Sequence, residues 1–197
     1  MIKTIIFDFD GVILDSNKAK GQAFVKLFKN QNQNIKKKIY DFHINNIGKS
    51  REYKIKHIIK NILKKKISKN NLSFLSKKFS LIVFEKVIKS KYILGVKEFL
   101  KYNSANYNFH LSTATPYNEI ISILEKKKII NFFDSIHGSP ESKDQHIKKI
   151  LKNWKYKKKE IIFIGDSLND YRVAKKNGII FFGIKNEFNN FNKLKFS

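Results

Sequence analysis

A short apolar run that ends in two aspartates near the N-terminus constrains the fold most. Residues 3–12 have the sequence KTIIFDFDGV. A run of β-branched and aromatic residues without polar alternation is typical of a strand buried on both faces, as in a parallel sheet. Asp8 then lies at the carboxyl end of that strand, where open α/β sheets bind their ligands. The sequence therefore predicts a site at this edge.

The two aspartates can act together. Asp8 and Asp10 are two residues apart, so in an extended backbone they point the same way. Gly11 allows the chain to turn and lets its backbone approach a ligand closely. Two convergent carboxylates favour a nucleophile beside an acid/base group, a divalent cation site, or both. The alternative is an acidic turn after an edge strand.

The composition limits the chemistry and the setting. The 197 residues are enough for one ordinary domain or a core with a modest insertion, and 42% hydrophobic residues can form a core. The chain has no Cys, which excludes disulfides, thiolate metal sites and cysteine nucleophiles. No apolar run is as long as a membrane span, and the first one ends in Asp8 rather than at a signal-peptide cleavage site. We expect a cytoplasmic protein without a membrane partner.

The net charge of +25 could indicate nucleic acid, an anionic membrane or a phosphorylated substrate. The chain has 41 basic residues, of which two are Arg (Arg51 and Arg172) and the rest are Lys. Proteins that read nucleic acid usually use Arg as well, because its guanidinium binds bidentately. The Lys residues are spread over every segment together with Ile and Asn, which indicates a compositional bias. We expect no nucleic-acid partner despite the basic charge.

The periodicity divides the chain into two parts. Residues 16–90 show helical spacing and no strand-like alternation, which predicts a helical block inserted after the first strand. Its expected helices cover 17–30, 35–40, 52–64 and 72–88. The later part alternates strands at 108–113, 135–138, 160–165 and 179–184 with helices at 96–102, 118–127, 143–153 and 170–177. This alternation predicts an α/β fold with a parallel sheet covered by helices on both faces. The pattern assigns no structure to the tail at 186–197.

Three further segments place polar side chains at predicted strand ends. In residues 108–116 (NFHLSTATP) a strand ends in hydroxyl residues before a helix, where Thr113 and backbone N–H groups can hold a phosphoryl oxygen. The alternative there is ordinary N-capping by Thr115. In residues 139–144 (SPESKD) a helix opens with Lys143. Residues 161–170 (IIFIGDSLND) place Asp166 and Asp170 about one helical turn apart, and two neighbouring acids favour Mg²⁺ as a partner.

The four segments resemble, in order, the four motifs of the haloacid dehalogenase superfamily of aspartate-nucleophile phosphatases. The resemblance implies a Rossmann-like parallel-sheet core at 1–15 and 91–197 with an inserted helical cap at 16–90, which sets substrate specificity. Within the superfamily the chain looks most like the phosphoglycolate phosphatase and β-phosphoglucomutase group. We therefore expect an enzyme whose partner is a small phosphorylated metabolite and which is a monomer or dimer.

The resemblance also implies a role for each motif residue. Asp8 is the nucleophile, Asp10 the acid/base residue, and Thr113 and Lys143 stabilise the phosphoryl oxygens. Mg²⁺ is expected to be held by Asp8, the backbone carbonyl of Asp10 and Asp166, while Asp170 supports either the metal site or Lys143. The residues expected to bind substrate are Gly11, Arg51 and Ala114.

The expectation that Arg51 binds substrate rests on the cap loop Gly48–Glu52, which resembles the substrate-facing loop of β-phosphoglucomutase. The alternative is a surface residue at a helix start. Two departures from that mutase favour a phosphatase: residues 165–167 are GDS instead of containing a Glu-Asp pair, and Lys20 stands where the mutase has His. We expect a Mg²⁺-dependent phosphatase that hydrolyses a phosphosugar or phosphoglycolate-like ester through an aspartyl-phosphate. A β-phosphoglucomutase-like mutase and a nucleic-acid-associated phosphatase remain alternatives.

Overall fold

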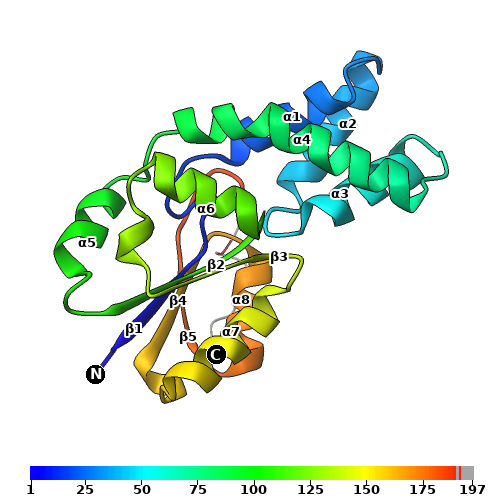
Figure 1. The fold of residues 1–197 in the computed structure, drawn as a ribbon. Coiled ribbons are helices and arrows are strands. Elements are labelled where there is room, and N and C mark those ends of the chain that lie inside the picture. The colour runs from blue at the N-terminus through cyan, green and yellow to red at the C-terminus, as the bar shows by residue number, and fades with distance from the viewer. Residues whose placement is uncertain (190, 192–197) are drawn as a thin grey trace.

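A five-stranded parallel sheet forms the centre of the molecule in the computed structural model, which describes residues 1–189 and 191 (Figure 1). The strand order is β3-β2-β1-β4-β5. The strands are β1 (Thr4–Phe7), β2 (Asn108–Pro116), β3 (Ser135–Ser139), β4 (Ile161–Gly165) and β5 (Ile180–Gly183). All four residues of the central β1 are buried, as expected for an apolar run between two parallel neighbours. The predicted α/β fold is confirmed.

Alternate residues of β1 face two separate helical layers. Ile5 and Phe7 belong to the larger hydrophobic cluster, and Ile6 belongs to a smaller one. The larger cluster includes residues of α5 (Val96–Asn103) and α6 (Tyr117–Lys126), and the smaller one residues of α7 (Lys143–Trp154) and α8 (Leu168–Asn177). Short 3₁₀ turns lie at Ile130–Phe132 and Lys158–Glu160. The two faces of the sheet are therefore both covered, as the strand–helix alternation predicts.

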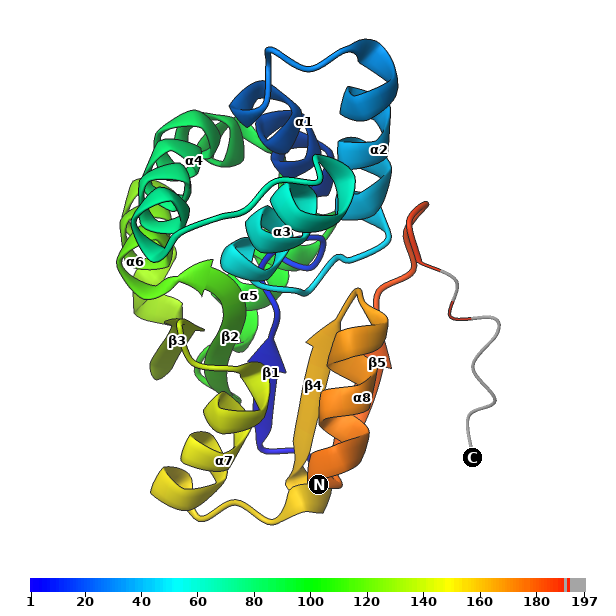
Figure 2. The ribbon, with the colours of Figure 1, turned by 90° about the vertical axis from the view of Figure 1, so that its right-hand side faces the viewer.

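Four helices follow β1 directly and lie together beyond the carboxyl edge of the sheet (Figure 2). They are α1 (Asn17–Leu27), α2 (Gln33–Ile44), α3 (Arg51–His57), which continues as a π-helical turn at Ile58–Ile62, and α4 (Lys69–Lys89). We call these helices the cap. Phe24 and Phe79 join α1 to α4, with ring centroids 4.2 Å apart. The cap boundaries at 16 and 90 stay a prediction.

Some details differ from the expected elements. The helix predicted at 35–40 is longer, since α2 covers Gln33–Ile44. β2 extends to Pro116, so Thr113 lies inside this strand instead of at its end. Part of the tail can now be placed, because Asn186 and Asn189 contact Asp166 at the end of β4. Residue 190 and residues 192–197, which belong to the predicted core and tail, lie outside the described residues. Within the described part of the chain, no helix has the length and apolarity needed to cross a membrane.

Candidate active site

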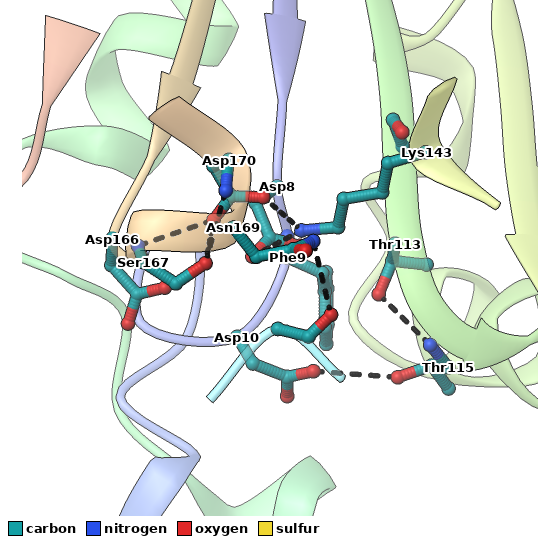
Figure 3. Close-up of polar contacts among 12 residues, drawn as sticks. Asp8, Phe9, Asp10, Thr113, Thr115, Lys143, Asp166, Ser167, Asn169 and Asp170 are labelled. Carbon is teal, nitrogen blue, oxygen red and sulfur yellow. Dashed lines mark hydrogen bonds and ion pairs between the residues drawn. The ribbon is translucent and has the colours of Figure 1, made fainter. Parts of the chain in front are cut away.

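The four predicted motif segments meet at the carboxyl edge of the sheet (Figure 3). Asp8 follows β1 and is 3% exposed. One oxygen of its carboxylate accepts a hydrogen bond from Phe9 N–H at 2.7 Å, and the other lies 2.8 Å from Lys143 Nζ. The parallel strands therefore bring the predicted nucleophile and the predicted cation into direct contact.

Lys143 joins two carboxylates. It is the first residue of α7, whose start is fixed by a reciprocal capping box between Ser142 and Gln145. Its Nζ lies 2.8 Å from Asp8 Oδ2 and 2.5 Å from Asp170 Oδ1. Burial alone would lower the pKa of Lys143, but the adjacent Asp170 and Asp8 carboxylates outweigh it and raise the pKa. Lys143 is therefore charged and available to neutralise a phosphoryl oxygen.

Three buried carboxylates form a cluster that suits a divalent cation. Asp8, Asp166 and Asp170 each present one oxygen within 4.8 Å of the others. Burial, which outweighs the opposing effect of Lys143, raises the pKa of Asp8 to about 7 with a further contribution from Asp170. Burial, followed by repulsion from Asp8 and Asp170, raises the pKa of Asp166 to about 8. Asp166 Oδ1 is buried and has no hydrogen-bond partner in the described residues. A carboxylate oxygen without a hydrogen-bond partner, beside a second acid, is the kind of ligand that Mg²⁺ binds, so the residues fit this ion.

Asp170 is held more tightly by the protein than Asp166. Its Oδ1 accepts from Lys143, and its Oδ2 accepts from Ser167 Oγ at 2.6 Å and from Ser167 N at 3.2 Å. Of the two roles that the resemblance leaves open for Asp170, these contacts favour support of Lys143. Gly165 is needed beside it, since a Cβ there would lie 2.4 Å from the Asp170 Cβ.

Asp10 faces a different set of partners. Its Oδ1 accepts from Ser16 Oγ at 2.5 Å, and its Oδ2 pairs with Lys20 and accepts from Thr115 Oγ1 at 3.3 Å. Burial would raise the pKa of Asp10, but the Lys20 ammonium overcomes this effect and lowers it. The side chain is thus outside the acidic cluster, which fits the expectation that only its backbone carbonyl contributes to a metal site.

The hydroxyl residues of β2 have separate tasks. Thr113 is fully buried, and its hydroxyl accepts from Thr115 N–H at 3.1 Å, which leaves its own proton to donate. Thr115 does not cap α6, because Pro116 occupies the N-cap and no side chain caps the helix. The capping alternative is therefore wrong, and Thr115 contacts Asp10 and Lys20 instead.

Gly11 is required by its close approach to Asp166. It has φ +77°, and a Cβ at this position would lie 1.9 Å from Asp166 Oδ2. Its N–H donates to Leu14 O at 2.7 Å. This donor is therefore engaged within the loop, and the predicted contact of Gly11 with substrate stays a prediction.

A cavity of about 40 Å³ lies between the acidic cluster and the cap. Its walls include Asp8, Asp10, Ala114, Thr115 and Lys143 from the core and Phe24, His43, Arg51, Lys54 and Phe79 from the cap. A single water needs roughly 10–15 Å³, so the cavity has room for only a few waters. A larger cavity of about 270 Å³ shares Ala114 and Lys143 with it and is lined on the cap side by Gly48, Lys49 and Ser50.

Arg51 is buried and bridges the cap to the core. Its Nη2 donates to both carboxylate oxygens of Glu119 on α6, at 2.7 and 2.8 Å, and its Nη1 donates to Ser80 Oγ at 2.5 Å. Its guanidinium carbon lies 4.7 Å from the centre of the Phe79 ring. The alternative of a surface residue is therefore wrong. Glu119 takes Nη2 of the guanidinium, and the predicted substrate contact of Arg51 stays a prediction.

Several polar residues of the site were not predicted from the sequence. Asn17 and Asn186 donate to Asp166 Oδ2 at 2.7 and 3.0 Å, and Lys20 pairs with Asp10. His43 and Lys54 contribute to the cavity wall from the cap. Only Lys20 carried a signal, because it stands where the related mutase has His. Asn and Lys are so common in this chain that pattern alone does not single out the others.

Comparison with solved structures finds the same architecture in several proteins. A haloacid dehalogenase-like hydrolase, SP0104, from Streptococcus pneumoniae is 23% identical with a TM-score of 0.71, and the match covers 93% of this chain and 85% of that one. A Haemophilus somnus protein predicted to be a phosphoglycolate phosphatase is 21% identical, with a TM-score of 0.76 and coverage of 92% and 84%. A Thermotoga maritima protein whose assignment as a β-phosphoglucomutase is itself a prediction is 19% identical, with a TM-score of 0.69 and coverage of 96% and 88%.

These identities support the fold alone, and no curated protein sequence matches the chain. The sequence model of the haloacid dehalogenase-like hydrolases matches residues 5–184, which include all four motif segments and the cap. Together with the meeting of those segments at one edge of the sheet, this match shows that the chain belongs to the haloacid dehalogenase-like hydrolase family.

Proposed function

We propose that this hydrolase is a Mg²⁺-dependent phosphatase that cleaves a small phosphomonoester through an aspartyl-phosphate on Asp8. One observation supports this proposal most. Asp8 and Asp10 follow the same strand, yet Asp8 contacts Lys143 inside the acidic cluster while Asp10 contacts Ser16, Lys20 and Thr115 outside it. Two carboxylates in separate environments can divide nucleophilic and proton-transfer work.

The first half-reaction uses both aspartates. An oxygen of Asp8 bonds to phosphorus while the bond from phosphorus to the leaving oxygen breaks, and Asp10 donates a proton to that oxygen. Lys143 and the Thr113 hydroxyl stabilise the phosphoryl oxygens. Mg²⁺ bound by Asp8, Asp166 and the Asp10 carbonyl would supply further charge neutralisation.

The second half-reaction regenerates the enzyme. Asp10, now ionised, takes a proton from a water, whose oxygen bonds to phosphorus as the bond to Asp8 breaks. Inorganic phosphate leaves and Asp8 is free again. The lowered pKa of Asp10 beside Lys20 suits this step, because it favours the carboxylate form.

The cap controls access in this proposal. A cavity of about 40 Å³ is too small for a phosphomonoester, so substrate has to extend into the larger space beside Thr113 and Lys143 or the cap has to move to admit it. Closure would then exclude bulk water during phosphoryl transfer. We propose that the cap side of the cavity selects a small phosphorylated metabolite.

A phosphomutase is the second candidate, because the structure is similar to the Thermotoga maritima protein assigned as a β-phosphoglucomutase. A mutase must return the phosphoryl group to a second substrate hydroxyl instead of to water. Lys20 argues against it, since it stands where the mutase has His and pairs directly with Asp10.

A substrate panel separates these functions. Phosphosugars, phosphoglycolate and nucleotides are incubated with the enzyme and Mg²⁺, and inorganic phosphate is measured with and without a sugar bisphosphate. We expect Mg²⁺-dependent phosphate release without the bisphosphate. Isomerisation of a phosphosugar that requires the bisphosphate, with no phosphate release, would show that the enzyme is a mutase.

A further inference from the structure

The cap side of the cavity contains a buried cation without an anionic partner. Lys54, on α3, is 5% exposed and lines the same cavity as Asp8. Among the described residues, no carboxylate lies within ion-pair distance of its Nζ. The other cations with limited exposure in this cavity are paired: Lys143 with Asp8 and Asp170, Lys20 with Asp10, and Arg51 with Glu119.

The orientation of Lys54 is fixed by a short hydrogen-bonded chain. His43 Nε2 lies 3.1 Å from the backbone carbonyl of Asn17, and His43 Nδ1 lies 3.1 Å from Lys54 Nζ. Because a carbonyl oxygen can only accept, Nε2 carries the imidazole proton, and Nδ1 accepts from Lys54. His43 is 1% exposed, so the acceptor is rigidly held. One donor position of Lys54 is thus used by the protein and the remaining ones are left for a ligand.

The electrostatics of Lys54 favour an anionic ligand. Burial, followed by repulsion from Lys20, lowers the pKa of Lys54 to about 7. A buried ammonium group is costly without an opposite charge nearby. The Asp10, Asp166 and Asp8 carboxylates offset only part of this effect, and a ligand that brings a negative charge into the cavity would relieve the rest.

We propose that Lys54, positioned by His43, binds a second anionic group of the substrate, a carboxylate or a second phosphate, while the scissile phosphoryl group contacts Asp8. The inference rests on the proposed phosphatase function and narrows its substrate class to short, doubly anionic phosphomonoesters. A short linker between the two anionic groups is expected, because Asp8 and Lys54 line the same cavity.

Three small compounds test the proposal directly. Phosphoglycolate carries a carboxylate, ethyl phosphate has a similar chain length without one, and ethylene glycol bisphosphate carries a second phosphate. We expect the wild-type kcat/KM for at least one of the two doubly anionic compounds to exceed that for ethyl phosphate by about tenfold or more, as for one charge-assisted contact. The better of the two identifies the anionic group. This comparison needs no variant.

Lys54→Met then tests the residue. We expect the preference for the doubly anionic compound to fall by about tenfold, mainly through a higher KM. His43→Gln, which disturbs the orientation of Lys54, is expected to lower the preference by a smaller factor. Lys56→Met is the matched control, because it removes the same charge from an exposed position two residues further along α3, and it should leave the preference unchanged.

The outcomes are distinguishable. If the wider substrate panel releases phosphate but none of these three compounds does, this inference fails and the proposed function stands. If no compound of either set releases phosphate, both fail. If ethyl phosphate is hydrolysed and the wild type shows no preference, only the role of Lys54 is overturned. An equal loss of kcat/KM on all three compounds in a folded Lys54→Met variant would also overturn it, because Lys54 would then support the cap instead of binding an anionic group.

Discussion

The two sides of the cavity carry opposite excess charge. On the core side, three buried carboxylates lie together, and two of them, those of Asp8 and Asp170, contact one ammonium group, that of Lys143. On the cap side, Arg51 is neutralised by Glu119, while Lys54 has no carboxylate partner in the described chain. This contrast underlies our proposals that the core side binds a cation and the cap side an anion.

This difference suggests that the core side carries out the reaction and the cap side selects the substrate. The core side chains sit at the ends of strands, so the sheet fixes their positions for any substrate. The cap side chains depend on how α1, α2 and α3 pack, and they can change without disturbing the nucleophile. We therefore expect substitutions on the core side to abolish turnover, and substitutions on the cap side to change substrate choice or cap closure.

The largest effect is expected for Asp8→Asn. The amide keeps the shape of the side chain but does not attack phosphorus, so phosphate release should fall by at least about a thousandfold on every substrate. Asp15→Asn, an exposed position in the loop that follows, is the matched control and should remain active. If Asp8→Asn retained most of its activity, the core side would have another nucleophile.

A smaller but still large effect is expected for Asp166→Asn. The substitution weakens one proposed Mg²⁺ ligand, so activity at fixed Mg²⁺ should fall by about a hundredfold. Thermal unfolding provides a second readout: Mg²⁺ should raise the Tm of the wild type and of Asp41→Asn, an exposed cap variant, but not that of Asp166→Asn. An equal rise in all three proteins would place the cation elsewhere.

An intermediate effect is expected for the pair that joins the two sides. Two guanidinium nitrogens of Arg51 hold Glu119 and Ser80 at the same time, which the single ammonium of a lysine cannot reproduce, so Arg51→Lys and Glu119→Gln should each lower kcat/KM by about tenfold. Because the pair acts on cap closure, phosphoglycolate and ethyl phosphate should be affected alike. Combining the two substitutions should add little.

Glu125→Gln, at an exposed position of the same helix, is the control for Glu119→Gln. A different result would assign Arg51 to substrate binding. In that case Arg51→Lys would raise KM for phosphoglycolate alone, and Glu119→Gln would have no effect. The cap side would then use Arg51 and Lys54 together.

The smallest effect is a shift in pH dependence. Lys20 lowers the pKa of Asp10, so Lys20→Met should raise it. Hydrolysis of the aspartyl-phosphate needs the Asp10 carboxylate, so the pH below which this step slows should become higher. Single-turnover rates from pH 4 to 9 measure the shift, with Lys26→Met on the exposed face of α1 as control. An unchanged pH dependence would mean that Lys20 does not set the ionisation of Asp10.

The core side was largely predictable from sequence, because each of its charged residues follows an apolar strand that is visible as a pattern. Asp8, Asp166 and Lys143 meet because parallel strands end at one edge. Thr113 was placed at the end of its strand, but β2 continues to Pro116.

The cap side could not be predicted in the same way. Helical periodicity indicates which residues are buried, but it does not indicate which helix will lie opposite. The contact of Arg51 with Glu119 joins residues far apart in the sequence, and Lys54 is one of many lysines. Its significance comes from burial and from the missing carboxylate, both of which are properties of the packed structure.

The central claim is that Asp8 receives the phosphoryl group while Asp10 moves the protons. Asp10→Asn with p-nitrophenyl phosphate tests it most directly, because this leaving group needs little acid assistance while water activation is lost. After acid quench and tryptic digestion, mass spectrometry of peptide 4–18 should show the added phosphoryl group on Asp8, at a higher level than in the wild type. Equal phosphorylation in variant and wild type, or none on Asp8 in either, would contradict the account.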